Sequence, residues 1–249
     1  KWISKILTLK RDDLFELLND DELEDFLGVS EVKKALHVKK GLFLQPPELK
    51  KKLLENCFIK IILNEKFVSF TEEKNKVEVD FKSGLRKSYD ALAVCTGKGL
   101  KDFNDNLKVS YGQMAGISNK DLFNIKKPLN HQGYIIPKVN GTNWIGSTYE
   151  QSTDFKKEKI EDKVKLNHAI FGKKGMPFEI QDLWEGERVS TRSNLPIASK
   201  MPGAKNIYCI GGLGSRGISY APFLAEIVSS AIQNKQIPLS KEIFTLLKI

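Results

Sequence analysis

The stretch that most constrains the fold is Asn206–Ala221, NIYCIGGLGSRGISYA. Its first part, Ile207–Ile210, is a short apolar run with β-branched and aromatic residues, which predicts a buried strand. Apolar residues recur at helical spacing from Ile218 to Ala231, which predicts a helix. The glycines between them are Gly211, Gly212, Gly214 and Gly217. A strand, a glycine turn and a helix in this order aim free backbone N–H groups at whatever lies above the start of the helix.

Two interpretations of this turn stay open. In the first, the partly positive helix start binds a phosphate or a developing anion, and Arg216 adds a full charge there. In the second, the glycines only let the helix pack closely on the strand. A dinucleotide fingerprint has an acidic residue about 20 positions later, and residues 234–237 contain none. The turn alone therefore does not decide between them.

Composition narrows the class of protein. A chain of 249 residues with 41% hydrophobic and 29% charged residues is typical of one large globular domain or two interleaved ones. Its apolar runs are too short to span a bilayer, and nothing resembles a secretion signal, so we expect a cytoplasmic protein without a membrane segment. Three scattered histidines argue against a metal site. Cys57, Cys95 and Cys209 form no CxxC, and we expect core thiols in a reducing compartment.

The net charge of +9 permits two interpretations. It favours a polyanionic partner, of which tRNA or another nucleic acid is the obvious candidate. The excess lysines would equally well cover solvated surfaces. The sequence does not show whether they cluster on one face.

The first half predicts three helical segments and then a β-meander. The meander ends at Thr96-Gly97, where the backbone is expected to lie close to something. The helical segments are Arg11–Leu27, a short turn at Ser30–Leu36, and a helix that starts at Pro47 after an extended Gly41–Leu44. The strands are Phe58–Leu63, Phe67–Thr71, Val77–Phe81 and Leu92–Val94, with a turn at Lys82-Ser83-Gly84.

The second half predicts antiparallel strands with one basic helix. Asn140-Gly141, between two alternating apolar runs within Asn130–Glu150, is the strongest hairpin pattern in the chain. The other expected elements are a strand at Val109–Ile117, a helix at Lys156–Phe171, a short helix at Phe178–Leu183, and a strand at Val189–Thr191.

Arg188 and Arg192 are four residues apart around this last strand. Side chains alternate along a strand, so positions four apart share a face. Two guanidiniums on one face would form a clamp for a carboxylate or phosphate. Alternatively, both are surface arginines paired with Glu185 or Glu187.

Several motifs together resemble the C-terminal part of the D-amino-acid-oxidase-like flavoproteins. They resemble most the FAD-dependent oxidoreductase domain of the bifunctional enzymes that modify the wobble uridine of tRNA. The shared motifs are GLFLxP with its helix from Gly41, GYIIP at 133–137, IGSTYE at 145–150, RVSTR at 188–192, Leu195-Pro196, GLGSRG, Ala221-Pro222, Ala225–Ile227 and Ile237–Leu239.

The resemblance implies a mixed α/β (α+β) fold that binds FAD and carries an interleaved, mostly antiparallel substrate part. Residues 1–108 and 196–249 would form the FAD-binding part, and residues 109–195 the substrate-binding sheet. The reaction would be oxidation of the glycine-like C–N bond of 5-carboxymethylaminomethyl-uridine. Hydrolysis of the resulting imine would leave aminomethyl-uridine and glyoxylate.

The same resemblance assigns roles to residues. Arg188 would hold the substrate carboxylate, with Arg192 and Tyr134 as further substrate contacts; Tyr134 is equally compatible with an ordinary half-buried tyrosine. Arg188 and Arg216 would be the catalytic residues. The cofactor-binding residues would be Thr96, Gly97, Gly211, Gly212, Gly214, Ser215, Arg216, Gly217 and Ile218.

Two departures from the family pattern are present. Ser193 stands where related flavoproteins usually carry an acidic residue. No segment before Gly97 has the strand–GxGxxG–helix pattern that would hold the ADP half of FAD. We therefore expect an upstream part of the same polypeptide to supply that fingerprint, together with a methyltransferase domain. We expect these 249 residues alone to bind FAD weakly or not at all.

Two other functions compete with tRNA modification. A glycine- or sarcosine-type amine oxidase would use the same arginines on a free amino acid. A basic RNA-binding or docking module without a cofactor would account for the missing fingerprint.

Overall fold

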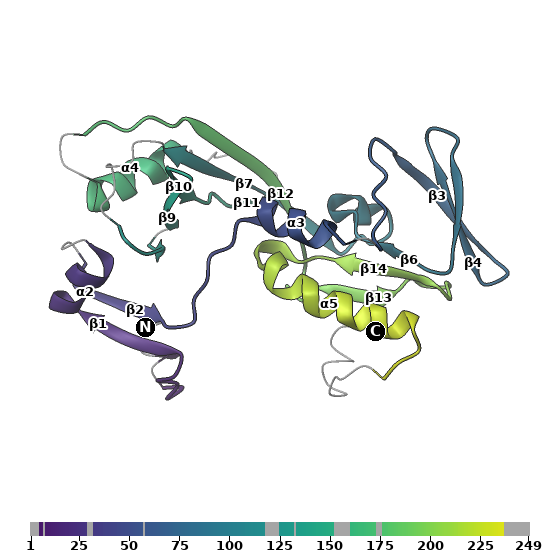
Figure 1. Ribbon diagram of the computed structural model, residues 1–249, viewed down its shortest axis with the longest axis horizontal. Helices are drawn as coiled ribbons and strands as arrows, with labels where there is room; N and C mark the ends of the chain where they lie inside the picture. The colour runs from purple at the N-terminus through teal and green to yellow at the C-terminus, as the bar shows by residue number, and fades with distance from the viewer. Residues whose placement is uncertain are drawn as a thin grey trace. The chain divides into compact units, whose positions relative to one another are not determined.

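The computed structural model describes residues 5–6, 8–28, 32–56, 58–117, 125–131, 133–151, 160–172 and 176–236. The chain divides into two compact units. Unit 1 comprises Lys1–Ile59, Gly112–Glu150 and Asp154–Gly186, and unit 2 comprises Lys60–Tyr111, Gln151–Thr153 and Glu187–Ile249. Helices accompany mostly antiparallel sheets (Figure 1), so the predicted mixed α/β class is confirmed. The functional roles assigned to the two parts of the chain stay predictions.

The start of unit 1 is a strand and not the expected helix. β1 (Phe15–Asn19) pairs antiparallel with β2 (Lys34–Val38), with Leu17 opposite Leu36. Of residues 11–27, α2 (Asp20–Leu27) is helical, and the Asn19 N–H donates to the Glu22 carboxylate at its start. The helix predicted over 11–27 is therefore confirmed for 20–27, where Gly28 ends it, and wrong for 15–19. The helical turn predicted at 30–36 is wrong, because residues 34–38 form β2. Cross-strand pairing of the leucines stabilises the extended form instead.

The main sheet of unit 1 has the strand order β11-β7-β10-β9-β8, and β12 also pairs with β7. Its strands are β7 (Leu107–Ile117), β8 (Leu129–Asn130), β9 (Tyr134–Val139), β10 (Thr142–Gly146), β11 (Glu150–Gln151) and β12 (Asp182–Thr191). The predicted hairpin is confirmed, since Asn140 and Gly141 have φ of 51° and 85°, as a type I′ turn requires. The expected helix at 178–183 is wrong. The Gln181 N–H donates to the Gly116 carbonyl at 3.0 Å, which leads the chain into β12.

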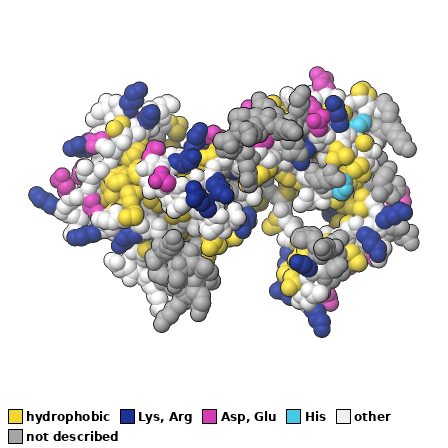
Figure 2. Space-filling view, turned by 180° about the vertical axis from the view of Figure 1, so that it is seen from behind, with side chains coloured by type: hydrophobic (Ala, Val, Ile, Leu, Met, Phe, Trp, Pro, Cys, Tyr) yellow, Lys and Arg dark blue, Asp and Glu magenta, His cyan; other side chains and the backbone are white. Residues whose placement is uncertain are grey.

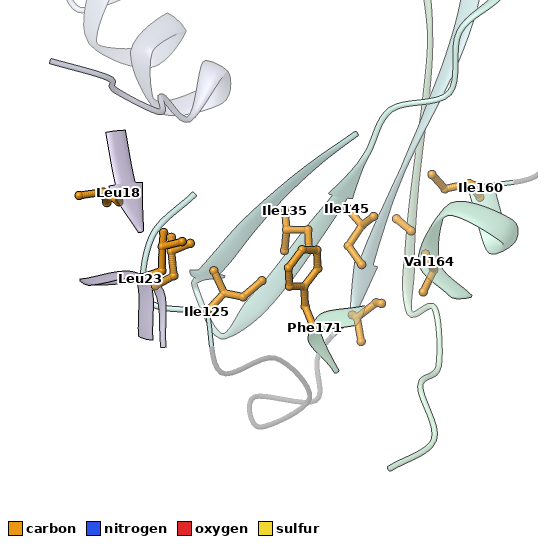
Figure 3. Close-up of a cluster of buried hydrophobic side chains, with 11 residues drawn as sticks. Leu18, Leu23, Ile125, Ile135, Ile145, Ile160, Val164 and Phe171 are labelled. Atoms are coloured by element: carbon orange, nitrogen blue, oxygen red, sulfur yellow. The ribbon is translucent and has the colours of Figure 1, made fainter. Parts of the chain in front are cut away.

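The core of unit 1 lies between this sheet and α4 (Ile160–Phe171), as Figure 3 shows. Ile135 and Ile145 from the sheet meet Val164 and Phe171 from the helix, and all four are buried. The helix is confirmed over 160–171, and its expected first residues, 156–159, lie outside the described residues. The apolar positions of β9 and β10 thus face one helix.

Unit 2 contains the predicted strand, turn and helix. β14 (Ile207–Gly211) pairs antiparallel with β13 (Ile197–Lys200) and parallel with β6 (Leu92–Val94). α5 (Gly217–Ile232) packs on β13 and β14 (Figure 1). Its buried side chains are Leu224, Ile227 and Val228.

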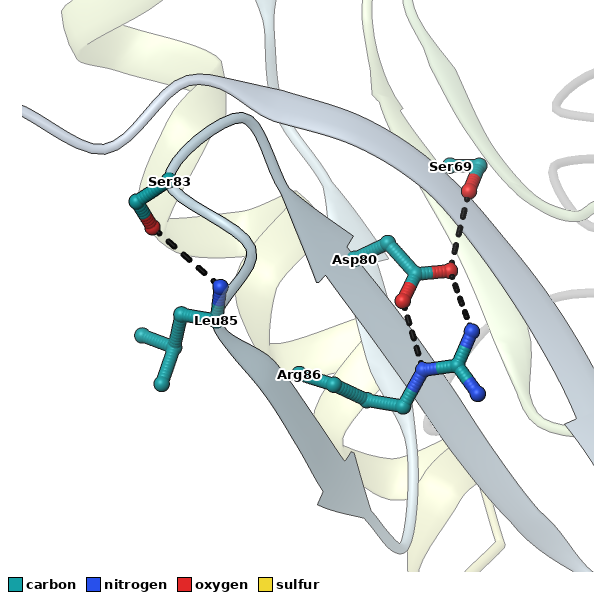
Figure 4. A network of polar contacts seen from close by, with 5 residues as sticks. All are labelled: Ser69, Asp80, Ser83, Leu85 and Arg86. Carbon is teal, nitrogen blue, oxygen red and sulfur yellow. Dashed lines mark hydrogen bonds and ion pairs between the residues drawn. The ribbon is translucent and has the colours of Figure 1, made fainter.

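The meander of unit 2 consists of β3 (Phe67–Glu73), β4 (Lys76–Phe81) and β5 (Arg86–Tyr89). Arg86 donates two hydrogen bonds, of 2.6 and 3.1 Å, to the Asp80 carboxylate, and Ser69 donates to the same carboxylate. Figure 4 shows how these three side chains converge. The Glu72 carboxylate accepts the backbone N–H groups of Lys205 and Asn206 at 2.8 and 2.7 Å. This side chain fixes the meander to the start of β14.

The segment expected to be the first strand of the meander is irregular. Phe58 and Leu63 are 92% and 75% exposed, and residues 58–63 pair with no strand among those described. A strand needs a neighbour for its backbone groups, so this prediction is wrong in the absence of one. The helix from Pro47 is confirmed as α3 (Pro46–Leu54), none of whose side chains is buried.

Within the described residues, no helix has the length and apolar character needed to cross a bilayer. No group of three or more His, Cys, Asp or Glu side chains in the same residues is placed to hold a metal ion. Cys209 is half-buried and Cys95 is exposed, so the expectation of a core thiol is wrong for Cys95, which follows the end of β6. Cys57 and Ile237–Leu239 lie outside the described residues.

Candidate functional site

The positions in the turn after β14 favour glycine for different structural reasons. A Cβ added to Gly211 would lie 2.1 Å from Leu100 Cδ1, and one added to Gly212 would lie 2.8 Å from Thr191 Cγ2. Close packing therefore disfavours a side chain at both positions, and Gly212, with φ of 66°, also has a left-handed backbone that favours glycine. At Gly214, with φ of 56°, the nearest atom is Ser190 Cβ at an ordinary 3.5 Å, so the left-handed backbone is what requires glycine.

The helix start after this turn has no side-chain cap. A 3₁₀ turn, η2 (Gly214–Arg216), leads into α5, and Arg216 at the N-cap makes no side-chain hydrogen bond to the first-turn N–H groups. Ser215, Arg216 and Ile218 are exposed, and Gly217 is half-buried with φ of −53°. The backbone donors of this first turn thus face a partly open surface.

The end of β6 lies beside this turn. β6 and β14 run parallel, so Thr96-Gly97 and Gly211 follow the same end of the sheet. Leu100 of the 3₁₀ helix η1 (Gly97–Asp102) packs directly against Gly211. Gly97 has φ of 58°, and a Cβ there would meet no atom within 4 Å. Its backbone is therefore open on that side.

The arginine-bearing strand contacts the same turn. Ser190 of β12 forms an antiparallel bridge with Leu213, one residue before Gly214. Arg188, two residues before Ser190, is half-buried and has at least one interaction partner. On the same strand, Glu187 forms an ion pair with Lys98 at 2.8 Å, which joins η1 to β12. The glycine turn, the end of β6 and the arginine strand thus meet within unit 2.

Arg192 lies just beyond this strand. β12 ends at Thr191, and the Arg192 N–H donates to the Asn106 carbonyl at 3.2 Å. The strand alternation from which a shared face with Arg188 was inferred therefore stops one residue before Arg192. The Arg192 side chain itself is exposed.

Arg216 has partners that the sequence did not indicate. Its guanidinium donates to the Asn194 carbonyl and, at 3.2 Å, to the Tyr220 hydroxyl, and it lies over the Tyr220 ring. Asn194 is in the turn after β12 and has φ of 59°. Arg216 therefore joins the start of α5 to the turn that contains Arg192.

Tyr134 belongs to unit 1, whereas all the other predicted site residues belong to unit 2. A Cβ on Gly146 would lie 2.8 Å from the Tyr134 ring and hydroxyl, so the ring lies directly over Gly146 of β10. The sequence did not predict the contact between Tyr134 and Gly146. It also did not predict the contacts made by Leu100, Ser190 and Asn194. The contacts of Leu100, Ser190 and Asn194 join residues far apart in the chain, and no local pattern encodes them. Tyr134 and Gly146 instead pair across the hairpin that Asn140-Gly141 predicted.

Comparison with known proteins places this arrangement in a family. The family model DAO, FAD dependent oxidoreductase, matches residues 2–231. A curated relative is the tRNA 5-methylaminomethyl-2-thiouridine biosynthesis bifunctional protein MnmC of Idiomarina loihiensis. It is 26% identical over 239 residues, which cover 92% of this chain and 39% of that protein. The chain thus spans about two fifths of the length of the curated relative.

Solved structures show the same fold. Glycine oxidase from Geobacillus kaustophilus has a TM-score of 0.78 at 14% identity, covering 92% of this chain and 66% of its own. Glycine oxidase from Bacillus cereus ATCC 14579 also has a TM-score of 0.78, at 20% identity, covering 95% and 71%. The resemblance inferred from the motifs is confirmed. The chain belongs to the DAO family of FAD-dependent oxidoreductases.

Proposed function

We propose that this chain oxidises an amine on the wobble uridine of tRNA, removing the carboxymethyl group of 5-carboxymethylaminomethyl-uridine to leave aminomethyl-uridine. The family match and the name of the MnmC relative support this assignment. The structural observation that carries it is the Ser190–Leu213 bridge. Through it, a strand that bears a half-buried arginine lies against a glycine turn with free backbone donors.

The residues of this end of unit 2 fit part of FAD. Gly97 leaves its backbone uncovered, and the first turn of α5 has N–H groups without a side-chain cap. Such a helix start suits an oxygen atom that gains negative charge. We propose that FAD is held by Thr96, Gly97, Gly211, Gly212, Gly214, Ser215, Arg216, Gly217 and Ile218. When bound, FAD supplies the two-electron acceptor, and the protein supplies position and electrostatics.

Arg188 is the proposed anchor of the substrate carboxylate. A guanidinium binds a carboxylate through two parallel hydrogen bonds, which fix orientation as well as distance. Partial burial strengthens such a pair relative to one in open water. Arg192 and Tyr134 are proposed as further substrate contacts. Arg216 is the second proposed catalytic residue, and its bond to Asn194 would at the same time hold the Arg192 turn.

We infer that the ADP half of FAD is bound by residues outside this stretch of sequence. No strand–GxGxxG–helix segment precedes Gly97 in the sequence. We propose that another part of the same polypeptide provides it, as the longer MnmC relative would allow. In the described residues β6 pairs only with β14, so one edge of this strand is available to a further strand.

The assay uses the protein expressed from its complete gene. We expect a flavin-bound product that converts carboxymethylaminomethyl-uridine in tRNA and releases glyoxylate. Arg188→Lys should raise KM by about 100-fold, because a lysine cannot form the bidentate pair. Arg192→Lys is the matched control and should change KM less. A flavin-free protein without this activity would contradict the proposal.

A free amino acid such as glycine or sarcosine is the competing substrate. Binding of tRNA through several phosphates should weaken steeply with salt, whereas turnover of a free amino acid should not. On the face shown in Figure 2, Lys and Arg side chains are scattered over the surface. Salt-insensitive oxidation of sarcosine without measurable tRNA affinity would favour this alternative.

A further inference from the structure

Tyr134, Gly146 and Met114 lie side by side on the face of the unit 1 sheet opposite its core. β10 runs between β9 and β7, and its Gly146 pairs with Tyr134 on one side and with Met114 on the other. Their neighbours in the sequence are fully buried in the core: Ala115, Ile135 and Ile145. Since successive side chains of a strand point to opposite faces, Tyr134 and Met114 point away from that core.

The Tyr134 and Met114 side chains close over Gly146 from opposite sides. A Cβ built on Gly146 would lie 2.8 Å from Met114 Cγ, from Tyr134 Cζ and from the Tyr134 hydroxyl oxygen. Neighbouring strands are about 4.8 Å apart, so these side chains meet above β10 because Gly146 carries none. The φ of Gly146 is not left-handed, so this angle does not require glycine, whereas the space above the residue does.

This packing restricts where the Tyr134 hydroxyl can lie. The phenol ring extends across β10, and Met114 occupies the far side of the space into which the ring would otherwise swing. Both side chains are half-buried. A polar group whose rotamer is fixed by packing binds a ligand without a further loss of side-chain freedom.

We propose that Gly146 and Met114 are positioning residues, which hold the Tyr134 hydroxyl in place as a substrate contact. Gly146 provides the space in which the phenol ring lies, and Met114 limits the movement of the ring. The inference rests on the proposed function, in which Tyr134 contacts the substrate.

A ring over a glycine can also stabilise a sheet without any role in binding. Gly116 of β7 is such a case on the same face, because a Cβ there would lie 3.1 Å from Trp144 Cη2. The two roles differ in what a substitution changes. Loss of packing lowers stability, whereas displacement of a substrate contact raises KM.

Steady-state kinetics of the flavin-bound protein, expressed from its complete gene, test the inference with tRNA that carries 5-carboxymethylaminomethyl-uridine. We expect Tyr134→Phe to raise KM about 5- to 10-fold with little change in kcat. Gly146→Ala should raise KM to a similar extent, because the methyl group displaces the phenol ring. In the Tyr134→Phe background, the same substitution should raise KM no further. Gly116→Ala is the matched control and should leave KM unchanged.

Substitutions of Met114 test the second positioning residue. Met114→Ala should raise KM about 2- to 4-fold, because the ring gains room to move. Met114→Leu keeps the side-chain volume and should retain the wild-type KM. Should Gly146→Ala fail to fold, this pair carries the test, and a wild-type KM in Met114→Ala would then overturn the inference.

Other results would also overturn the positioning role. These are a wild-type KM in Gly146→Ala or in Tyr134→Phe, or the same rise of KM from Gly146→Ala with and without the Tyr134 hydroxyl. Turnover of the tRNA by the wild-type protein would leave the proposed function standing in each case. Oxidation of sarcosine but not of the tRNA would instead contradict the proposed function. The same KM pattern with sarcosine would then support the positioning role, and turnover of neither substrate would contradict both.

Discussion

The guanidinium of Arg216, at the start of α5, donates a hydrogen bond to the backbone carbonyl of Asn194, in the turn after β12. A charged donor to a carbonyl contributes about 1.5–3 kcal/mol when well shielded, and less at an exposed site such as this one. The contact ties together two segments that carry predicted site residues.

Removing this contact should destabilise unit 2 modestly. We expect Arg216→Ala to lower the free energy of unfolding by about 1 kcal/mol, measured by urea denaturation. Arg216→Lys should not restore it, because an ammonium cannot reproduce the fork that reaches both Asn194 and Tyr220. Tyr220→Phe is the control and should have a smaller effect. Identical midpoints for Arg216→Ala and wild type would show that the contact contributes nothing.

Adding a methyl group at Gly211 should destabilise the protein, because the methyl group would clash with the Leu100 side chain. Gly211→Ala would place Cβ 2.1 Å from Leu100 Cδ1, and such overpacking costs about 1–3 kcal/mol. Leu100→Ala in the same chain should recover part of this loss, which a double-mutant cycle would measure. Gly217→Ala is the control, since φ is −53° and the nearest atom is 3.9 Å away. It should be neutral or slightly stabilising.

The Glu72 carboxylate should contribute more to the free energy of unfolding than that of Glu73, its exposed neighbour. Glu72→Ala leaves the N–H groups of Lys205 and Asn206 without this acceptor, and we expect a loss of about 2 kcal/mol in unfolding free energy. Glu73→Ala, at an exposed position one residue on, should lie within about 0.5 kcal/mol of wild type. Equal effects of the two substitutions in thermal or urea unfolding would contradict the assignment.

Because of the Asp80–Arg86 pair, we expect the stability of the protein to decrease slightly as the pH is lowered. The hydrogen bonds from Arg86, with help from Ser69, hold the pKa of the Asp80 carboxyl below its usual range. A carboxyl whose folded pKa is lowered stabilises the fold fully above its unfolded pKa, near about 4. This contribution disappears as the pH falls through the lower folded pKa. The melting temperature of wild type should therefore exceed that of Asp80→Asn at pH 6 and converge with it toward pH 2. A constant difference over this range would refute the linkage.

The thiols of Cys95 and Cys209 should react slowly at neutral pH. Desolvation raises the pKa of the Cys95 thiol, and burial together with the nearby Cys95 raises that of Cys209. The thiolate is the nucleophile, so alkylation by iodoacetamide should accelerate above pH 9. Cys95, the exposed residue, should be modified before half-buried Cys209, as peptide mass spectrometry would show. Rapid labelling of Cys209 at pH 7 would contradict this.

Local patterns in the sequence predicted the elements that local forces determine. Asn140-Gly141 predicted its hairpin because its two positive φ angles favour these residues. The strand, glycine turn and helix of 207–232 were predicted by apolar periodicity. The predictions for residues 15–19 and 58–63 were wrong, because strand formation depends on whether a partner strand is present. Apolar periodicity does not report this.

The sequence by itself determined the family, the glycine turn and the residue types that suit an anion and a carboxylate. Only the tertiary structure decided which of them meet. The Ser190–Leu213 bridge, the packing of Leu100 on Gly211 and the Arg216–Asn194 bond each join segments distant in the chain. Such contacts form because close-packed surfaces must match in shape and polar groups must find partners. Neither condition can be evaluated from a one-dimensional pattern of residues.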